Sequence, residues 1–326
     1  MKRLLVVVAL SLSLAPRALG WGDKGHKLIA DVAAAGLGSS ATLKVQQLLG
    51  GKSMAAVALW ADEMRTWQTK PQNGVPPGLQ GDLVAKAFHD DHRNDSQPEW
   101  HFTDPPVGVT SYHAGGFGTK PDDVAQTIKR CVRILKHQAP ATENITDQQA
   151  LRLLIHYVGD IHQPLHAASG YWVKGQGGKA VLAPPAQAKN GIEDRGGNSL
   201  KYGPAKTDNL HIFWDGHMVD AAQKPLTRAQ YLQKLITLAG GGHTKPWTLS
   251  GNPLSWPEQW AGESAATNIQ VYHAVKTGGL GINAAKQLTG KIVIPPTYVG
   301  AFTGTVNQQL ARAGFRLAAT LNAIWP

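Results

Sequence analysis

The sequence has a single cysteine among its 326 residues, and this scarcity excludes an intramolecular disulfide. Cys131 lies at helical spacing from the apolar residues Val124, Ile128 and Ile134, which predicts a buried core thiol rather than a reactive one. Because the chain cannot cross-link itself through sulfur, we expect its stability to come from a hydrophobic core and from any metal that it binds.

Long apolar runs are also scarce, and none after the first twenty residues is long enough to span a bilayer. At the start of the chain, two basic residues precede an apolar run over residues 4–14, and the small residues of Ala18-Leu19-Gly20 follow it. This order predicts a secretory signal peptide over residues 1–20, whose removal leaves Trp21 as the new N-terminus. An uncleaved membrane anchor is the alternative, which the short apolar run disfavours. We therefore expect a secreted or periplasmic protein without stable membrane association.

Acidic residues are fewer than basic ones, 22 against 32, which gives a formal net charge of +10. Three of the basic residues belong to the expected signal peptide, so the mature chain carries +7 (10 − 3). A basic surface attracts polyanions and speeds their encounter, although charge alone identifies no partner.

Strand signals are few and short, and the clearest one covers residues 291–295. Apolar residues instead recur at helical spacing, which predicts an all-α, mostly helical fold in one domain, residues 21–326. Residues 68–99 and 170–197 are rich in glycine, proline and polar side chains, and they predict two long surface loops. Helices are expected over residues 25–49, 54–67, 121–138, 146–163, 208–223, 227–239, 255–276 and 302–324.

Histidine is plentiful, with 13 residues, and several histidines lie near aspartates at helical spacing. His156 and Asp160 are four residues apart and share one helix face, and His211 and Asp215 repeat that spacing. For one such pair alone, a core histidine bonded to a carboxylate is the simpler interpretation. Two pairs favour zinc, because imidazole and carboxylate are its usual ligands and buried carboxylates need a neutralising partner. Further candidates in apolar or aromatic surroundings are Asp62, with Arg65 one turn on, His101 and His166.

Six short motifs together resemble a known family, and the resemblance covers nearly the whole mature chain. The family is that of the zinc-dependent single-strand nucleases, or class I nucleases, of fungi, plants and bacteria, which share a superfamily with zinc-dependent phospholipase C. Each motif alone is weak evidence, whereas the combination is highly specific. The motifs are Trp21 with Gly25-His26, Trp60-Ala61-Asp62, Trp100-His101-Phe102, the run from His156 to His166, Gly196-Gly197-Asn198, and the segment from His211 to Asp215.

The resemblance implies a cleft that holds three Zn²⁺. It also implies that the signal peptide must be removed before the third zinc site can form, because the free amino group of the mature chain is one of the ligands. The implied ligands are Asp62, His101, His156 and Asp160 for the first zinc; His166, His211 and Asp215 for the second; and His26, bridging Asp160, and the amino nitrogen and carbonyl oxygen of Trp21 for the third.

The resemblance further implies an endonuclease that hydrolyses single-stranded DNA and RNA to 5′-phosphorylated products, with 3′-nucleotidase activity. Zinc lowers the pKa of bound water from about 16 to near 7, which supplies a nucleophile at neutral pH. Asp62 is expected to orient that nucleophile, and Arg65 to offset the charge that grows on the phosphoryl oxygens.

A base pocket is implied as well, with Phe102 stacking on a base and with Asp104 and Asn198 bonding its edge. Stacking contributes about 1–3 kcal/mol per base and tolerates any sequence, so it favours unpaired strands. Phe102 could instead be a core residue, and Asn198 a turn residue after two glycines. The expected partners are single-stranded nucleic acid and nucleotides, and the protein is expected to be a monomer.

Two other functions are open at this point. The first is a zinc-dependent phospholipase C with the same metals, although Asp215 stands where that branch typically has glutamate. The second is a non-catalytic periplasmic zinc-binding protein, which the presence of Asp62 and Arg65 beside all three proposed metal sites disfavours. His89 and His92 have no role in this scheme, and a solvated loop cluster is the simpler interpretation for them.

Overall fold

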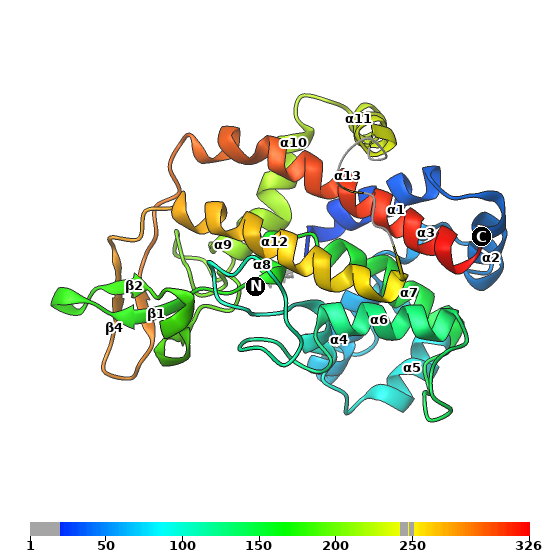
Figure 1. Ribbon diagram of the computed structural model, residues 1–326, viewed down its shortest axis with the longest axis horizontal. Helices are drawn as coiled ribbons and strands as arrows, with labels where there is room; N and C mark the ends of the chain where they lie inside the picture. The colour runs from blue at the N-terminus through cyan, green and yellow to red at the C-terminus, as the bar shows by residue number, and fades with distance from the viewer. Residues whose placement is uncertain (1–19, 242–246, 248–250) are drawn as a thin grey trace, which may run out of the picture.

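The computed structural model describes residues 20–241, 247 and 251–326, so nearly all of the expected signal peptide lies outside the described residues. Helices make up most of the described chain and form one body, with two small sheets at one end (Figure 1). The predicted mostly helical fold is therefore confirmed. Within the described residues, no helix combines the length and the apolar character needed to cross a membrane.

Helix α7 (Asp147–Asp160) lies at the centre of this body, and all its residues from Gln149 onward are buried. It begins at a capping box, in which Thr146 Oγ1 accepts the N–H of Gln149 while the Gln149 side chain accepts the N–H of Thr146. The helix continues to Asp160, so residues four apart in its last turn, such as His156 and Asp160, share one face.

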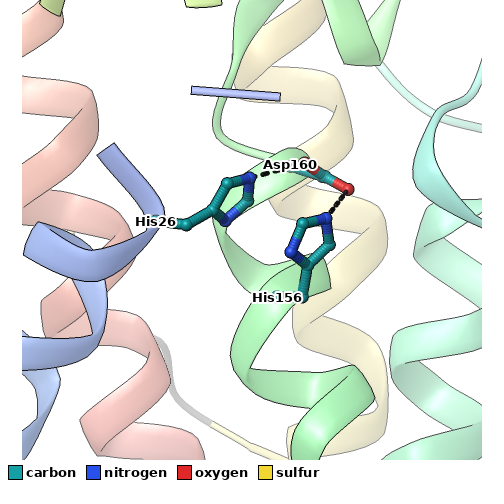
Figure 2. A group of neighbouring side chains, drawn as sticks. All are labelled: His26, His156 and Asp160. Atoms are coloured by element: carbon teal, nitrogen blue, oxygen red, sulfur yellow. Dashed lines mark ion pairs between the residues drawn. The ribbon is translucent and has the colours of Figure 1, made fainter. Parts of the chain in front are cut away.

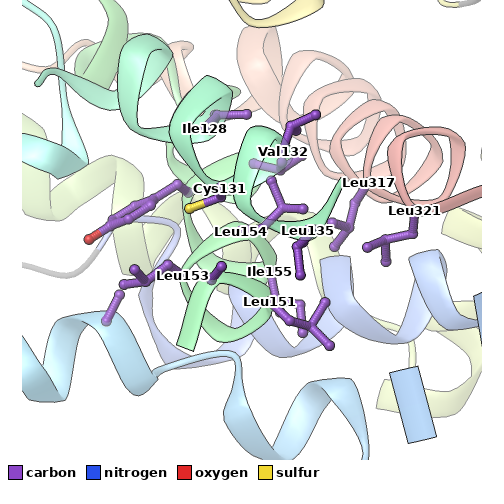
Figure 3. Packing of buried hydrophobic residues seen from close by; sticks show 14 of the residues in the cluster. Ile128, Cys131, Val132, Leu135, Leu151, Leu153, Leu154, Ile155, Leu317 and Leu321 are labelled. Carbon is purple, nitrogen blue, oxygen red and sulfur yellow. The ribbon is translucent and has the colours of Figure 1, made fainter. Parts of the chain in front are cut away.

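The main core forms where α7 packs against α6 (Val124–Leu135) and the C-terminal helix α13 (Tyr298–Ile324) (Figure 3). Cys131 points into this core from α6 and is fully buried, as predicted. Burial raises the pKa of its thiol to about 12, so the thiol is protonated and unreactive at neutral pH.

The first and last helices of the described chain pack along each other, α1 (Gly22–Ala35) against α13. Gly314 allows this close approach, since a Cβ at that position would lie 2.4 Å from Cγ1 of Val32. Helix α1 also contacts α7, which brings residues near the start of the mature chain to the centre of the molecule.

Two sheets project from one end of the helical body (Figure 1). Strands β1 (Tyr171–Lys174), β2 (Ala180–Leu182) and β3 (Ile192–Glu193) form an antiparallel sheet in the order β2-β1-β3. Strands β4 (Leu280–Ile282) and β5 (Leu288–Gly290) form the second sheet, and a bridge between Lys179 and Gly281 joins the two. We call residues 170–209 and 274–297, which contain both sheets, the β lobe.

The predictions for these segments were partly wrong. The expected loop over residues 170–197 contains the first sheet, and the expected loop over residues 68–99 contains helix α5 (Leu83–His92), capped by Asp82. The expected strand over residues 291–295 reduces to a single bridge between Val293 and Lys276. In each case the local composition was ambiguous, and pairing or capping by neighbouring residues decided the structure.

The expected helices are present, with some of them interrupted. The helix predicted over residues 25–49 is two helices, because the chain breaks at Gly36 and Gly38. The helix predicted over residues 208–223 contains a π-helical turn, Phe213–Met218. The remaining helices are α2 (Ser39–Leu48), α3 (Met54–Val57), α4 (Trp60–Thr69), α8 (Pro164–Ala167), α9 (Leu210–Ile212), α10 (Val219–Gln223), α11 (Arg228–Gly240) and α12 (Trp256–His273), with the 3₁₀ helix η3 (Gln97–His101) among the shorter turns.

Candidate metal centre

The last turn of α7 carries the central pair of the site, His156 and Asp160, both fully buried. Their one-turn spacing places Nε2 of His156 3.1 Å from Oδ2 of Asp160. The other ring nitrogen, Nδ1, donates to the carbonyl oxygen of Ala58 at 2.7 Å, which fixes the ring orientation and leaves Nε2 facing the carboxylate.

His26 reaches the same carboxylate from α1 (Figure 2). Its Nε2 lies 3.2 Å from Oδ1 of Asp160, and its ring stacks on that of His156 with centroids 3.9 Å apart. Gly159 makes room for it, since a Cβ there would lie 2.7 Å from Nδ1 of His26. The glycine before Asp160 is therefore required by the close approach of α1 to α7.

Asp62 from α4 and His101 from η3 contribute to the same cluster as His156 and Asp160. Nδ1 of His101 lies 2.9 Å from Oδ2 of Asp160 and 3.8 Å from Oδ1 of Asp62. Oδ2 of Asp62 lies 3.6 Å from Nε2 of His156, while its Oδ1 accepts a hydrogen bond from Arg65 at 2.6 Å. Four elements thus contribute side chains to one buried cluster.

A second cluster, of His166, His211 and Asp215, lies beside the first. Nδ1 of His166 donates to the carbonyl oxygen of His101 at 2.8 Å, and Nδ1 of His211 donates to that of Gly196 at 2.7 Å. The two Nε2 atoms, which then carry lone pairs, face each other at 3.1 Å. A cation between them would remove this repulsion, and Oδ2 of Asp215, 3.5 Å from Nε2 of His211, would add a negative ligand.

The donor atoms of both clusters fit a metal. Buried polar side-chain atoms in native proteins almost always have hydrogen-bond partners, and a group without one normally has a bound ion or another explanation. Three groups of residues, His26 with His156 and Asp160, Asp62 with His101 and His156, and His166 with His211 and Asp215, each bring ligand atoms within 4.8 Å of one another. The buried atoms without a hydrogen-bond partner include both ring nitrogens of His26, Oδ2 of Asp62, Nε2 of His101 and His156, Oδ1 of Asp160, and Oδ2 of Asp215.

Electrostatics favours neutral imidazole ligands at most of these positions. Burial lowers the pKa of His101 to about 4 and that of His211 to about 3, so both rings are neutral at pH 7. At His156 the carboxylates of Asp160 and Asp62 outweigh burial and raise the pKa to about 9, so a metal there would displace a proton. Burial raises the pKa of Asp215 well above its usual value, and ionising this carboxyl requires a nearby cation.

Trp21 lies against the same turn of α7. Its side chain is fully buried, and its indole Nε1 donates to the carbonyl oxygen of Gly159 at 3.1 Å. A Cβ on the preceding residue, Gly20, would lie 2.0 Å from Oδ1 of Asp160 and 2.8 Å from Cε1 of His166. The backbone at residues 20 and 21 therefore borders the centre, and coordination by the Trp21 amine stays a prediction.

The predicted base-pocket residues lie next to the clusters. Phe102 follows His101 directly and is half-buried, outside the set of buried core residues. Asp104 is buried and accepts a hydrogen bond from Ser169 Oγ at 2.6 Å, and burial, aided by Glu193, raises its pKa to about 7. Asn198 donates to the carbonyl oxygen of Arg195 at 2.9 Å, which is the turn contact considered as its alternative role.

Sequence reasoning missed several residues that hold the ligands in place. Gln163 donates from Nε2 to Oδ1 of Asp215 at 2.8 Å, and Gly196 supplies the carbonyl that orients His211. Gln163 belongs to the His156 to His166 motif, but no feature of its type or spacing predicted this contact. Ser169 Oγ joins the two parts of the site, because it also accepts the N–H of Gly196 at 2.7 Å.

Three other histidines contribute to packing instead. His162 points away from the ligand face, as expected, and donates from Nδ1 to the carbonyl oxygen of Val158 at 2.7 Å. His89 stacks on Trp67, and His92 bonds Asp95 at 2.9 Å. In the part of the chain that the structure describes, neither histidine joins a group with metal-binding geometry.

Three buried groups of histidine and aspartate within a helical body are typical of a metal-binding protein. A family model described as S1/P1 Nuclease matches residues 21–326. The chain is 26% identical to Nuclease S1 of Aspergillus oryzae over 339 residues, which covers 99% of this chain and 98% of that protein. It is 26% identical to Nuclease P1 of Penicillium citrinum over 318 residues, which covers 93% and 97% respectively.

Plant proteins match over a similar length. Identity to Endonuclease 2 of Arabidopsis thaliana is 24% over 345 residues, covering 99% of this chain and 96% of that protein. The chain belongs to the S1/P1 nuclease family. It is therefore a hydrolase that cleaves nucleic acid, and the predicted family and enzyme class are confirmed. The names of these relatives give no support to the phospholipase C alternative.

Proposed function

We propose that the mature chain is a secreted, monomeric endonuclease that cleaves single-stranded DNA and RNA at a centre of three Zn²⁺. The observation that carries this proposal is the convergence of His/Asp groups around Asp160, with unpartnered ligand atoms aimed at one another. Membership of the nuclease family supports the choice of nucleic acid as substrate. Cleavage after Gly20 would remove the signal peptide and free the amino group of Trp21.

The ligands divide among three zinc ions in this proposal. Asp160 would belong to two of the ligand sets, because its two carboxylate oxygens lie next to different histidines: Oδ1 next to His26, and Oδ2 next to His101 and His156. The proposed sets are Asp62, His101, His156 and Asp160 for the first zinc; His166, His211 and Asp215 for the second; and His26, Asp160 and the backbone nitrogen and oxygen of Trp21 for the third.

Bound zinc would supply Lewis acidity and lower the pKa of bound water to near 7. Asp62 would hold and orient the attacking water, since its Oδ2 is buried among the ligands and has no hydrogen-bond partner. Burial opposes its ionisation, but Arg65 and the neighbouring histidines lower its pKa, so the carboxylate is charged at neutral pH. Arg65 is partly exposed and bonded to Asp62, which places its guanidinium where it can stabilise the charge of a phosphate entering from solvent.

The pocket beside the centre would hold one unpaired base. Phe102 would stack on the base, and Asp104 and Asn198 would bond its edge. The pKa of about 7 for Asp104 means that its carboxyl can donate or accept a hydrogen bond near neutral pH, which suits different bases. One base and one phosphate fill this site, so nucleoside 3′-phosphates would be substrates as well, and attack that expels the 3′ oxygen leaves 5′-phosphorylated products.

Metal content and substrate range together test this function. Purified mature protein should contain close to three zinc ions. It should cleave single-stranded DNA and RNA but not phosphatidylcholine. Removal of the metal by a chelator should abolish the cleavage of nucleic acid. Asp160→Asn should abolish cleavage and lower the zinc content, because it removes the carboxylate that bridges two zinc ions. Asp220→Asn is a matched control, since Asp220 is exposed and pairs with Lys24 on the surface. Full activity with one tightly bound zinc would refute the trinuclear proposal.

A further inference from the structure

The net positive charge of the mature chain is concentrated in the β lobe. The lobe contains nine basic and three acidic residues, whereas the rest of residues 21–326 contains 20 basic and 19 acidic residues. The helical body is therefore almost neutral, at +1, and the lobe carries +6. The nine cations, all exposed except the half-buried Lys201, are Lys174, Lys179, Lys189, Arg195, Lys201, Lys206, Lys276, Lys286 and Lys291.

The lobe also differs from the body in how its charges are paired. Many cations of the body pair closely with carboxylates: Arg130 with Glu143 at 2.7 Å, for example, and Lys129 with Glu258 at 2.7 Å. Among the residues that the structure describes, no carboxylate oxygen lies within 4.0 Å of any of the nine lobe cations. Charges that lack an internal partner are free to bind an external polyanion.

Two of the three acidic residues of the lobe do little to offset this charge. Asp194 is fully buried and accepts hydrogen bonds from Trp172 Nε1 at 2.8 Å and Tyr272 Oη at 2.8 Å. Burial raises its pKa to about 6. Asp208 accepts the N–H of Ala205 at 2.9 Å within its own turn. These carboxylates organise the backbone of the lobe, and the cations dominate its surface.

Exposed aromatic rings accompany these cations. Among the described residues, the large hydrophobic side chains that are exposed include two aromatic ones, Phe117 at 52% and Tyr202 at 37%. Tyr202 belongs to the lobe, and the ring of Phe117 lies 5.1 Å from that of Tyr171 in β1. Basic surfaces with exposed aromatic rings are typical of proteins that bind single-stranded nucleic acid, because bases stack on the rings while cations contact phosphates.

The lobe is built directly onto the metal centre. Strand β1 follows shortly after α8, which carries His166, and the turn after β3 supplies the Gly196 carbonyl that orients His211. Tyr171 of β1 donates from its hydroxyl to the carbonyl oxygen of Asp104 at 2.9 Å. A strand with one nucleotide in the site would therefore have the basic lobe as its neighbouring surface.

We propose that the β lobe binds the part of a single strand that extends beyond the nucleotide held at the metal centre. This inference rests on the proposed function, and it predicts that long strands are cut more efficiently than the shortest substrates. Each phosphate contact in a single strand adds about 0.7 to the slope of log affinity against log salt, so cleavage of long strands should also be salt-sensitive.

The test compares two triple variants on a long oligodeoxythymidine and on a thymidine dinucleotide. The lobe variant carries Lys174→Gln, Lys179→Gln and Lys276→Gln, all of them exposed and none a proposed ligand or base-pocket residue. The control variant removes three charges from the helical body, on α2, after α6 and on α11. Zinc content and circular dichroism are measured for both variants. The control substitutions are Lys44→Gln, Lys136→Gln and Lys234→Gln.

The lobe variant should lower the ratio of kcat/KM for the long strand to kcat/KM for the dinucleotide by about tenfold. Its salt slope on the long strand should fall by about 2, which is three phosphate contacts at about 0.7 each. The control variant should keep both the ratio and the slope of the parent. An unchanged ratio and an unchanged salt slope in the lobe variant would overturn the inference. If the triple variant does not fold, the single substitutions Lys179→Gln and Lys276→Gln provide the same test. Failure of the parent enzyme to cut either substrate would instead count against the proposed function.

Discussion

The residue before Trp21 gives the sharpest test of the third zinc site. In the proposal, the free α-amine of Trp21 is a ligand, and its ordinary pKa of about 8 allows metal binding at neutral pH. Retaining Gly20 converts that amine into an amide nitrogen, which is a poor ligand. Replacing the retained glycine with alanine adds a Cβ that would lie 2.0 Å from Oδ1 of Asp160 and 2.8 Å from Cε1 of His166.

The structure predicts a graded effect. Loss of partners that only support a metal ligand already costs about 10–100-fold in affinity or activity, so loss of a direct ligand should cost at least about 100-fold. That factor corresponds to about 2.7 kcal/mol. With Gly20 retained, zinc content should fall from three ions to two and most nuclease activity should be lost. With alanine in its place, the contact with Asp160 should disturb the other zinc ions as well.

The assay needs three proteins that differ only at the N-terminus. Fusion proteins cleaved by a specific protease would yield chains that start at Trp21, at Gly20, or at alanine followed by Trp21, with each terminus verified by mass spectrometry. Zinc content, circular dichroism and the rate of single-strand cleavage are then compared. Equal zinc and equal rates in the first two proteins would refute coordination by the amine, and a loss confined to the alanine form would show that the effect is only steric.

Three further predictions concern other parts of the molecule. Gly159→Ala should lower the free energy of unfolding by about 1–3 kcal/mol and reduce zinc content, because its Cβ would lie 2.7 Å from Nδ1 of His26; urea unfolding with an unchanged midpoint would contradict this. Phe102→Ala should raise KM for single-stranded oligonucleotides about tenfold, or 1.4 kcal/mol, and identical kinetics would show that the ring lies outside the substrate path. At Asp82, burial opposes ionisation, but the hydrogen bond and charge of Arg152, the backbone N–H of Ala85 and the charge of Lys52 together outweigh burial and lower the folded pKa. The pair with Arg152 therefore stabilises the protein above about pH 4, and this contribution is lost as the pH falls through the folded pKa. Asp82→Asn should therefore lower the free energy of unfolding by about 1–3 kcal/mol at pH 7, and the difference between parent and variant should be smaller at pH 3. Thermal melts that show the same difference in melting temperature at both pH values would argue against the ion pair.

Much of the helical layout was predictable, because helical periodicity and caps are local signals. The four-residue spacing of His156 and Asp160 predicted that both side chains share one helix face, and they do so at the end of α7. Asp62, His101, His156 and Asp160 lie close together in the structure, and their role as ligands of one zinc stays a prediction. The spacing could not predict the hydrogen bonds that hold the proposed ligands. The contact of Gln163 with Asp215, for example, joins residues 52 positions apart.

The β lobe could not be predicted for a related reason. Its strands are two to four residues long, and the segments that form the two sheets lie about a hundred residues apart in the sequence. Glycine, proline and lysine in these segments indicate loops when each is considered alone. Pairing between segments, such as the bridge from Lys179 to Gly281, supplies hydrogen bonds that no single window of sequence contains.

The side chains around Asp160 come from distant parts of the chain: His26 from α1, His101 from η3, and His156 from α7. Metal bound there would close loops of 75 and 55 residues at one point, much as a pair of disulfides would. Such cross-links need no oxidant to form, and a reductant does not break them. Folding would therefore not depend on the redox state of the surroundings. Folding would depend instead on the supply of free zinc. An environment that sequesters zinc would shorten the lifetime of the folded enzyme and also abolish its activity.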